Sequence, residues 1–170
     1  MKQTIEILAD VLCIAAITAP KAKGINNIVV RKIDDVEKSQ LIERMEKIAA
    51  EKNHKGFLRD VKGLEKADAV ILIGTKLGRI GLLVCGLCGA INCADAEQKQ
   101  KMCVYNNGDL GIAIGSLVSK AADFRLDNRV MYSAGYAARE MKMLGEDVEL
   151  IFAIPLSVSA KNVFFDREIL

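Results

Sequence analysis

The stretch AVILIG, residues 69–74, is an unbroken apolar run that ends in glycine. A run of this length is typical of a β-strand that is buried on both faces, because a solvent-facing side would carry polar residues at alternate positions. We therefore expect a buried strand here. The segments on either side of this strand predict the elements that cover it.

Helical and extended patterns alternate on both sides of this strand. On the N-terminal side we expect a helix over residues 3–18 that Pro20 ends, a strand over 27–33, a helix from Asp35 to about Lys52, and a mixed polar segment 53–66 with a short helix after Gly63. On the C-terminal side we expect helices over 108–124 and 129–144, the second ended by Gly145, a strand over 148–154 stopped by Pro155, and an irregular tail 156–170. This order predicts a mixed α+β fold: a single domain over residues 1–170, with a central sheet of few strands flanked by helices.

Length and charge exclude several classes of protein. The 170 residues are about one domain's length, and 24 basic against 22 acidic residues give a net charge of +2. That balance gives no argument for binding nucleic acid or a membrane surface. No apolar run is long enough to span a membrane, and Glu6 and Asp10 interrupt the N-terminal helix, so we expect no secretion signal. We expect a cytoplasmic, reducing location without structural disulfides.

Four cysteines follow the buried strand within nineteen residues: Cys85, Cys88, Cys93 and Cys103. Residues 74–93 hold three of them together with five glycines and have no regular period, which is typical of a binding loop. Thiolates at such short intervals are the ligands of an iron–sulfur cluster, and four are needed for a [4Fe-4S] cluster. We therefore predict a cysteine-rich, cluster-binding loop over residues 79–105.

Other interpretations of the cysteines stay open. A structural zinc site usually pairs C-x2-C with a second, separated pair, which is missing here, and the only histidine, His54, is distant. Small cysteines in a core, or a lost or disulfide-linked site, form the third alternative. Cys13 lies on the apolar face of the first predicted helix, where a structural role is the ordinary expectation.

The segment CGLCGAINCADA, residues 85–96, resembles a known cluster-binding element. It is similar to the CG-x-CG-x3-C-x2-A element of the four-cysteine domain in Rnf-type electron-transport subunits and in carbon monoxide dehydrogenase/acetyl-CoA synthase complexes. The resemblance implies iron–sulfur ligation by Cys85, Cys88 and Cys93. The last gap is shorter here than in that family, which leaves Cys103 as the least certain ligand.

A wider resemblance covers nearly the whole chain. It rests on TAPKAKGINNI (18–28), the cysteine loop, DLGIAIGSLVSKAADFRLDNRVMYSAGYAAREM (109–141) and IPLSVSAKNVFFDR (154–167). Together these segments resemble an uncharacterised prokaryotic family of "ferredoxin domain-containing" proteins with a domain of unknown function. The resemblance implies an iron–sulfur protein and no established activity.

The order of elements is also similar to the nitroreductase-like flavoprotein fold. In that fold a helix leads into an A-P-S-x-x-N-type turn beside FMN, and APKAKGINN (19–27) occupies that place here. The resemblance implies bound FMN, with Lys21, Lys23 and Asn27 near its phosphate. The arginine pair that usually holds this phosphate is missing, so Lys21 and Lys23 are either its replacements or solvated loop lysines.

Two further polar clusters are candidate cofactor ligands. Arg125 and Arg129 lie between two apolar helices and could grip an anionic cofactor, or they could simply form a helix junction. Ser157 and Lys161 follow the last strand and could line a phosphate or substrate edge, or belong to a solvated tail. Gly111, Gly115 and Ser119 recur every four residues on one helix, which indicates close helix packing, a flat ligand or a dimer interface.

These patterns favour a redox protein that transfers electrons through a [4Fe-4S] cluster, coupled to a flavin held between the subunits of a homodimer. Its partner would be a redox protein or a small-molecule acceptor. The sequence leaves open whether the protein is a flavin/iron–sulfur oxidoreductase, a non-enzymatic electron carrier or a zinc-stabilised binding module.

Overall fold

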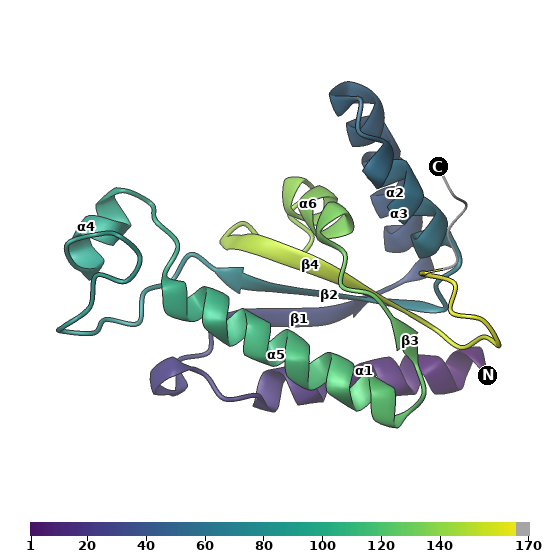
Figure 1. Cartoon of the computed structure of the whole chain (residues 1–170), viewed down its shortest axis with the longest axis horizontal. Helices are drawn as coiled ribbons and strands as arrows, with labels where there is room; N and C mark the ends of the chain where they lie inside the picture. Colours follow the sequence, from purple (N-terminus) through teal and green to yellow (C-terminus); the bar gives the residue numbers. More distant parts are fainter. Residues whose placement is uncertain (166–170) are drawn as a thin grey trace.

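A small antiparallel sheet with helices on both faces forms the body of the molecule (Figure 1). The computed structural model describes residues 1–165. The sheet has the order β1-β2-β4-β3, and the elements are α1 (Lys2–Thr18), the 3-10 turn η1 (Ala22–Gly24), β1 (Ile28–Ile33), α2 (Asp35–Lys52), α3 (Lys55–Glu65), β2 (Ala69–Lys76), α4 (Cys93–Gln98), α5 (Val104–Asp123), β3 (Asp127–Asn128), α6 (Tyr132–Glu140) and β4 (Val148–Ser157). The expected mixed α+β fold is confirmed.

The sheet separates two hydrophobic cores. Ile71 and Ile73 of β2 belong to the core under α1 and α5, whereas Val70 and Leu72 belong to the core under α2, α3 and α6. Successive side chains of a strand point to opposite faces, so a strand covered on both sides must be apolar throughout. β2 is buried from Ala69 to Thr75, which confirms the strand expected at AVILIG and extends it to Lys76.

The helix expected after Gly63 lies earlier in the chain. It is α3, and Gly63 lies inside it. Phe57, Val61 and Leu64 have helical spacing and are buried against the core. Arg59, Asp60 and Lys62 lie between them and hide this stripe in the sequence, which is why the segment reads as mixed and polar.

The sequence predicts that Pro155 stops the last strand. This prediction is wrong. β4 continues through Pro155 to Ser157, and Pro155 is paired with Val70. The N–H of Ala153 donates to the oxygen of Met131 at 3.0 Å, so the nitrogen of Pro155, two residues on, faces the same side. On that side, the nitrogen of Pro155 lies between the isolated bridge from Ala153 to Met131 and the pairing of β4 with β3. Proline is tolerated because no ladder hydrogen bond is lost.

Other boundaries also differ from the expected ones. β3 was not expected, and because residues 127–131 run along β4, α6 begins at Tyr132 instead of residue 129. α6 also ends earlier than expected, at Glu140 instead of residue 144, and residues 141–144 form a turn. α5 begins at Val104, where the oxygen of Cys103 accepts from the amides of the first turn. The tail is irregular over 158–165 as predicted, and its last part, 166–170, lies outside the described residues.

The helix α6 packs directly on the backbone of β4. A Cβ atom added at Gly135 would stand only 1.9 Å from the oxygen of Ile151. Only glycine allows this approach, because real Cβ atoms do not come so close to a backbone oxygen. No helix within residues 1–165 is long and apolar enough to cross a membrane.

Candidate functional site

Residues 77–103, here called the cysteine lobe, connect β2 to α5 and project beyond the end of the sheet (Figure 1). The lobe contains the short helix α4, which Asn92 caps by accepting a hydrogen bond from the Asp95 amide at 2.9 Å. The rest of the lobe has no regular structure. It holds the four clustered cysteines, so it is the candidate functional site.

The four cysteines have different places in the lobe. Cys85 and Cys88 lie in an irregular turn, Cys93 is the first residue of α4, and Cys103 precedes the first turn of α5. The first three are half-buried and Cys103 is buried, and all are free thiols. Cys13 lies in α1, where burial raises the pKa of its thiol to about 11, as fits a structural cysteine.

The lobe does not present an assembled metal site. Within residues 1–165, no three side chains of the types His, Cys, Asp and Glu lie together in a way that could hold a metal ion. The donor chemistry fits an iron–sulfur cluster, since four free thiols lie in one glycine-containing lobe. The arrangement of these thiols does not yet fit, and cluster binding therefore requires the lobe to rearrange.

The cysteine turn uses two glycines in the left-handed region. Gly86 has φ 134° and Gly89 has φ 74°. The amide of Gly89 donates to the oxygen of Gly86 at 2.8 Å, which closes the turn around Cys88. Residues other than glycine rarely adopt these backbone φ angles. Gly86 and Gly89 therefore determine the path of the chain past the thiols.

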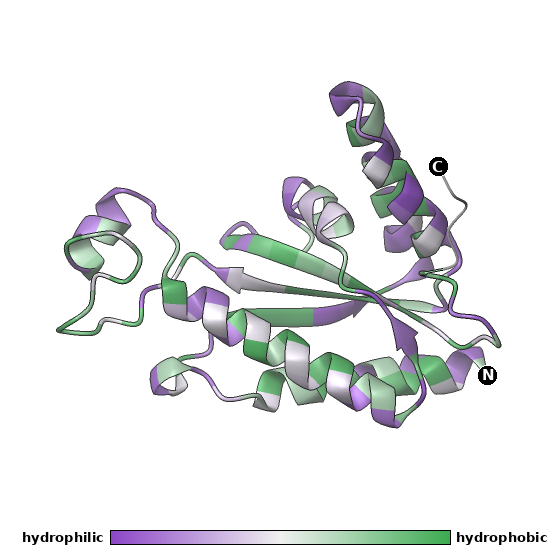
Figure 2. Cartoon of the chain, viewed as in Figure 1, coloured by the Kyte–Doolittle hydropathy of each residue, from purple (hydrophilic) through white to green (hydrophobic). Residues whose placement is uncertain are grey.

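The tip of the lobe is apolar and exposed. Leu83 is fully exposed, Val84 is 93% exposed, and Leu87 and Ile91 are also exposed. No charged residue occurs from Ile80 to Asn92. Figure 2 shows hydrophobic segments along this part of the lobe, away from the cores of the body.

A buried amide network lies where the lobe joins the body. Nδ2 of Asn106 donates to the oxygens of Lys76 and Gly78, at 3.2 and 2.9 Å, and its Oδ1 accepts from Nδ2 of Asn27 at 3.0 Å. Asn106 is fully buried. The network ties the entry stem of the lobe to its exit stem. Sequence reasoning missed Asn106, although a polar residue at the start of an apolar helical stripe is a signal for such a network.

Two other polar residues at the base were also missed. Asp109 is buried and accepts a hydrogen bond from the Ala22 amide on both oxygens, at 3.1 Å each. Arg79 donates to the oxygens of Leu77 and Ala96, at 2.7 and 3.0 Å, and so connects the entry stem to α4. Its Nε is buried without a hydrogen-bond partner among the described residues.

Lys21, Lys23 and Asn27, predicted to bind a cofactor, all lie near the base of the lobe. The ammonium of Lys21 donates to the oxygens of Ala16, Ile17 and Ala19, so it caps the end of α1, and burial lowers its pKa. Lys23 adopts φ 55° and reaches the oxygen of Ile80 at 3.4 Å. Asn27 belongs to the amide network. Lys21 and Asn27 thus have their polar groups engaged within the fold.

The other predicted ligands lie at the opposite end of the sheet. Ser157 is paired with Asp127 near the start of β2, whereas Asn27 lies beside its end. The eight residues of β2 separate the two ends by about 23 Å at the usual rise of a strand. One chain therefore does not bring Lys21, Lys23 and Asn27 together with Arg125, Arg129, Ser157 and Lys161.

Arg129 is part of a buried ion-pair network. Its guanidinium lies 3.4 Å from Oδ1 of Asp60, and Oδ2 of Asp60 accepts from the hydroxyl of Ser133 at 2.7 Å. Asp60 and Ser133 are buried. This arrangement supports the helix-junction interpretation of Arg129. Arg125 is exposed and adopts φ 57°, and Lys161 is exposed in the tail.

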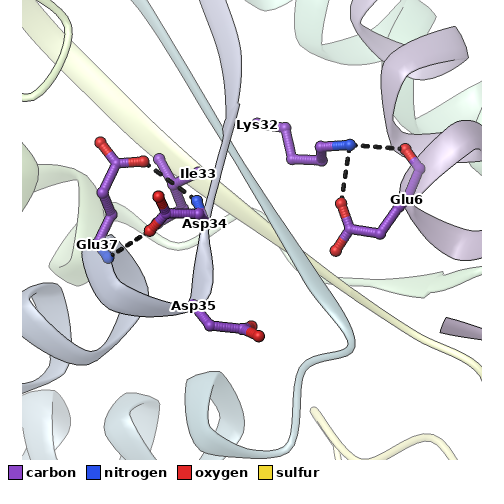
Figure 3. Close-up of a pocket in the computed structure, with 6 residues that line it drawn as sticks. All are labelled: Glu6, Lys32, Ile33, Asp34, Asp35 and Glu37. Carbon is purple, nitrogen blue, oxygen red and sulfur yellow. Dashed lines mark hydrogen bonds and ion pairs between the residues drawn. The ribbon is translucent and has the colours of Figure 1, made fainter. Parts of the chain in front are cut away.

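A surface pocket beside α1 and α2 has mostly acidic walls. It is lined by Glu6, Lys32, Ile33, Asp34, Asp35 and Glu37 (Figure 3). Its charges are paired within the fold: Lys32 lies 2.8 Å from Glu6, and Asp34 and Glu37 form the capping box of α2. The pocket lies at the start of β2, at the end of the sheet opposite the cysteine lobe.

The sequence is similar to a known family and to one relative that covers nearly the whole chain. Residues 99–167 match the model of a family described as "Uncharacterized protein containing a ferredoxin domain (DUF2148)". An uncharacterized protein from Archaeoglobus fulgidus is 33% identical over 96% of this chain and 91% of its own length.

The fold is similar to solved nitroreductases. A nitroreductase from Desulfitobacterium hafniense with bound FMN gives a TM-score of 0.62 at 17% identity, over 91% of this chain and 78% of that one. The FMN-dependent nitroreductase NfnB from Mycobacterium smegmatis gives 0.64 at 11% identity, over 94% and 81%. Nitroreductase A from Vibrio parahaemolyticus gives 0.59 at 14% identity, and this chain spans only 59% of its length. At these identities the likeness shows that the fold is nitroreductase-like.

Proposed function

We propose that this chain, which belongs to the family of uncharacterized proteins containing a ferredoxin domain, is an iron–sulfur redox protein. One observation carries the proposal: four free cysteines gather in a single lobe that projects from a nitroreductase-like body. Three of these thiols are half-buried and Cys103 is buried, and none of the four belongs to either hydrophobic core.

Cys85, Cys88, Cys93 and Cys103 would hold a [4Fe-4S] cluster. When bound, such a cluster accepts and donates single electrons. The chain's own contribution is positional. Cys103 is fixed at the start of α5, and Asn106 in the same helical turn anchors both stems of the lobe. The other three cysteines lie on the part of the lobe that must close toward Cys103.

Metal and sulfide analysis of protein purified under nitrogen tests the proposal. We expect about four irons and four sulfides per chain, with the broad brown absorption of a cluster. Cys88→Ser should lose most of the iron, whereas Cys13→Ala, which removes the cysteine outside the lobe, should keep it. Wild-type protein that stays colourless and iron-free after anaerobic reconstitution would refute the proposal. Zinc in place of iron would instead support a zinc-stabilised binding module.

A flavin shared by two copies of the chain is the second part of the proposal. Related folds include one solved with bound FMN. The predicted ligands lie at the two ends of the sheet, so an antiparallel pair of copies would set Lys23 of one copy near Arg125 of the other. The α1–α5 layer is suited to such pairing. It exposes Ile7, Ile14, Ile17 and Ile112, and Gly111 and Gly115 leave open space beside α5.

A non-enzymatic electron carrier is the second candidate function. The observation in its favour is that Lys21, Asn27 and Arg129 are engaged in contacts within the fold, so they are not poised to hold a flavin phosphate. The visible spectrum separates the two candidates. A yellow flavin band beside the cluster absorption supports the oxidoreductase, and cluster absorption alone supports the carrier, whose partner would be another redox protein.

A further inference from the structure

Arg79, in the entry stem of the lobe, has a guanidinium group that lacks one acceptor. The group donates to the backbone oxygens of Leu77, Gly78 and Ala96, at 2.7, 3.1 and 3.0 Å. Its Nε is buried and has no hydrogen-bond partner among the described residues. Leaving a buried donor without an acceptor is costly, so an orphaned Nε indicates that a ligand atom supplies the missing acceptor.

Lys23 brings a second cation to the same stem. Its ammonium reaches the oxygen of Ile80 at 3.4 Å, and Ile80 directly follows Arg79 in the chain. The side chain belongs to an exposed residue of the η1 turn. Two cations from segments far apart in the sequence therefore meet at adjacent residues of the stem.

The charges of Arg79 and Lys23 are not neutralised by the chain. Over residues 1–165, no carboxylate lies within ion-pair distance of either group. By contrast, Lys76 at the end of β2 pairs with Asp147 at 2.9 Å. Asp109, at the same base, directs both oxygens to a backbone amide of the η1 turn. The two cations are thus left to attract an anion from outside the chain.

Open space lies beside both cations. Gly24 follows Lys23, and Gly81 lies two residues after Arg79; both glycines have left-handed φ angles, 68° and 70°. A Cβ atom added at either glycine would have nothing within 4 Å. The backbone beside each cation therefore leaves room for a ligand.

We propose that Arg79 and Lys23 form an anion site for a phosphate group at the base of the cysteine lobe. Guanidinium and ammonium groups are the side-chain groups that proteins use to bind phosphate. A phosphate oxygen would supply the acceptor that Nε of Arg79 lacks, and the phosphate charge would neutralise both cations.

The site deepens the flavin part of the proposed function and rests on it for one source of the phosphate, FMN. Lys21 and Asn27 are engaged within the fold, which leaves Lys23 as the free cation of the turn over residues 19–27. That turn contains no arginine. Arg79, from the neighbouring stem, would take the place of the missing guanidinium.

Thermal unfolding with added inorganic phosphate tests the site in protein free of metal and flavin. A ligand that binds only the folded chain raises the melting temperature. Phosphate should stabilise the wild type more than sodium chloride of equal ionic strength does. Lys23→Gln should weaken phosphate binding roughly tenfold, the scale of one lost charge-assisted hydrogen bond. Lys99→Gln is the matched control, because Lys99 already pairs with Asp95 at 2.7 Å, and it should bind phosphate as the wild type does.

Arg79→Lys tests the guanidinium itself. The variant keeps the charge and loses the planar fork, so it should also bind phosphate more weakly. Circular dichroism shows whether it folds, and if it does not, Lys23→Gln still decides. Absence of stabilisation by phosphate, or equal phosphate binding by Lys23→Gln and wild type, would overturn the site.

Riboflavin, which lacks the phosphate of FMN, distinguishes the two sources of the anion. If the phosphate belongs to a flavin, FMN should bind more tightly than riboflavin, and Lys23→Gln should remove most of this difference. Stabilisation by phosphate with equal binding of FMN and riboflavin would support the site and assign it to free phosphate. Protein that takes up neither iron nor flavin would refute the proposed function, and the phosphate titration would still decide the anion site.

Discussion

Asn27 and Asn106 join their side-chain amides beneath the cysteine lobe, with Nδ2 of Asn27 donating to Oδ1 of Asn106 at 3.0 Å. Asn27 lies directly before β1, and Asn106 lies in the first turn of α5. Asn106 also holds two backbone oxygens of the entry stem. Asn106 therefore helps to fix the lobe on the body, together with the amide of Leu77, which donates to the oxygen of Asp147 at 3.2 Å.

Asn106→Ala should lower the free energy of unfolding by about 2–3 kcal/mol. It leaves the oxygens of Lys76 and Gly78 and the amide of Asn27 without their partner, and a buried unsatisfied polar group costs about 1–3 kcal/mol. Asn107→Ala is the matched control, since Asn107 is exposed, and its effect should stay within about 0.5 kcal/mol. Urea unfolding measures both. Equal stability of the two variants would mean that the network contributes little.

Gly135→Ala should prevent stable folding or cost more than about 3 kcal/mol, because the added Cβ would collide with the backbone oxygen of Ile151. Gly108→Ala offers a contrast within the same chain. It lies in α5 with nothing within 4 Å of an added Cβ, so the change should stabilise the helix by up to about 1 kcal/mol. Thermal unfolding followed by circular dichroism compares them, and a Gly135→Ala protein of wild-type stability would contradict the packing of α6 on β4.

The ion pair between Arg31 and Glu37 should make stability depend on pH. The hydrogen bond from Arg31, with its charge, lowers the pKa of the Glu37 carboxyl below its usual value. A lowered folded-state pKa adds stability above the unfolded value, near 4.5, and that stability is lost as the pH falls through the folded value. The pair is partly exposed, so we expect about 1 kcal/mol at pH 7.

Glu37→Gln should therefore be less stable than wild type at pH 7, and the difference should shrink below about pH 4.5. Glu46→Gln removes an exposed carboxylate from the same helix and should change stability little at either pH. Urea unfolding at pH 7 and pH 3 makes the comparison. A difference that grows toward low pH would contradict the assigned ion pair.

Ile112→Asp should reduce the dimer fraction if two copies pair through the α1–α5 layer. Ile112 is 48% exposed on α5, and a carboxylate buried at an interface without a partner is costly. Val36→Asp, on the opposite helical layer and also exposed, should leave the assembly unchanged. Light scattering after size exclusion gives the mass. A wild-type protein that is monomeric at every concentration would refute the proposed pairing.

The elements built on one apolar pattern could be predicted from sequence. AVILIG predicts β2 because burial on both faces removes every polar position, and the helices α1 and α2 follow from their stripes. α3 could not be placed, since Asp60, a polar residue inside its stripe, is buried by partners far along the chain: Ser133 and Arg129. Pro155 misled for a similar reason, because the gap in the ladder that tolerates it is made by residues 129–130.

The candidate site was predicted in its residue types and not in its arrangement. Spacing alone predicts that the four cysteines share one loop; the structure places them in the lobe of residues 77–103, where Cys93 begins the unexpected helix α4. The assignment of Lys21 and Arg129 as cofactor ligands came from their charge, and charge does not reveal whether a helix end or a buried carboxylate already engages it. The separation of the predicted ligands between two ends of the sheet depends on strand order, which the sequence does not state.

Asn106 joins both stems of the cysteine lobe at the end of the sheet. The lobe is therefore attached to the body as a separate unit. Its contents can be reorganised, lengthened or exchanged while the sheet and both cores keep their geometry. A chimera that carries a different metal-binding loop between Gly78 and Cys103 should therefore inherit a ready-made body, and the redox chemistry of such proteins could diversify without a new fold.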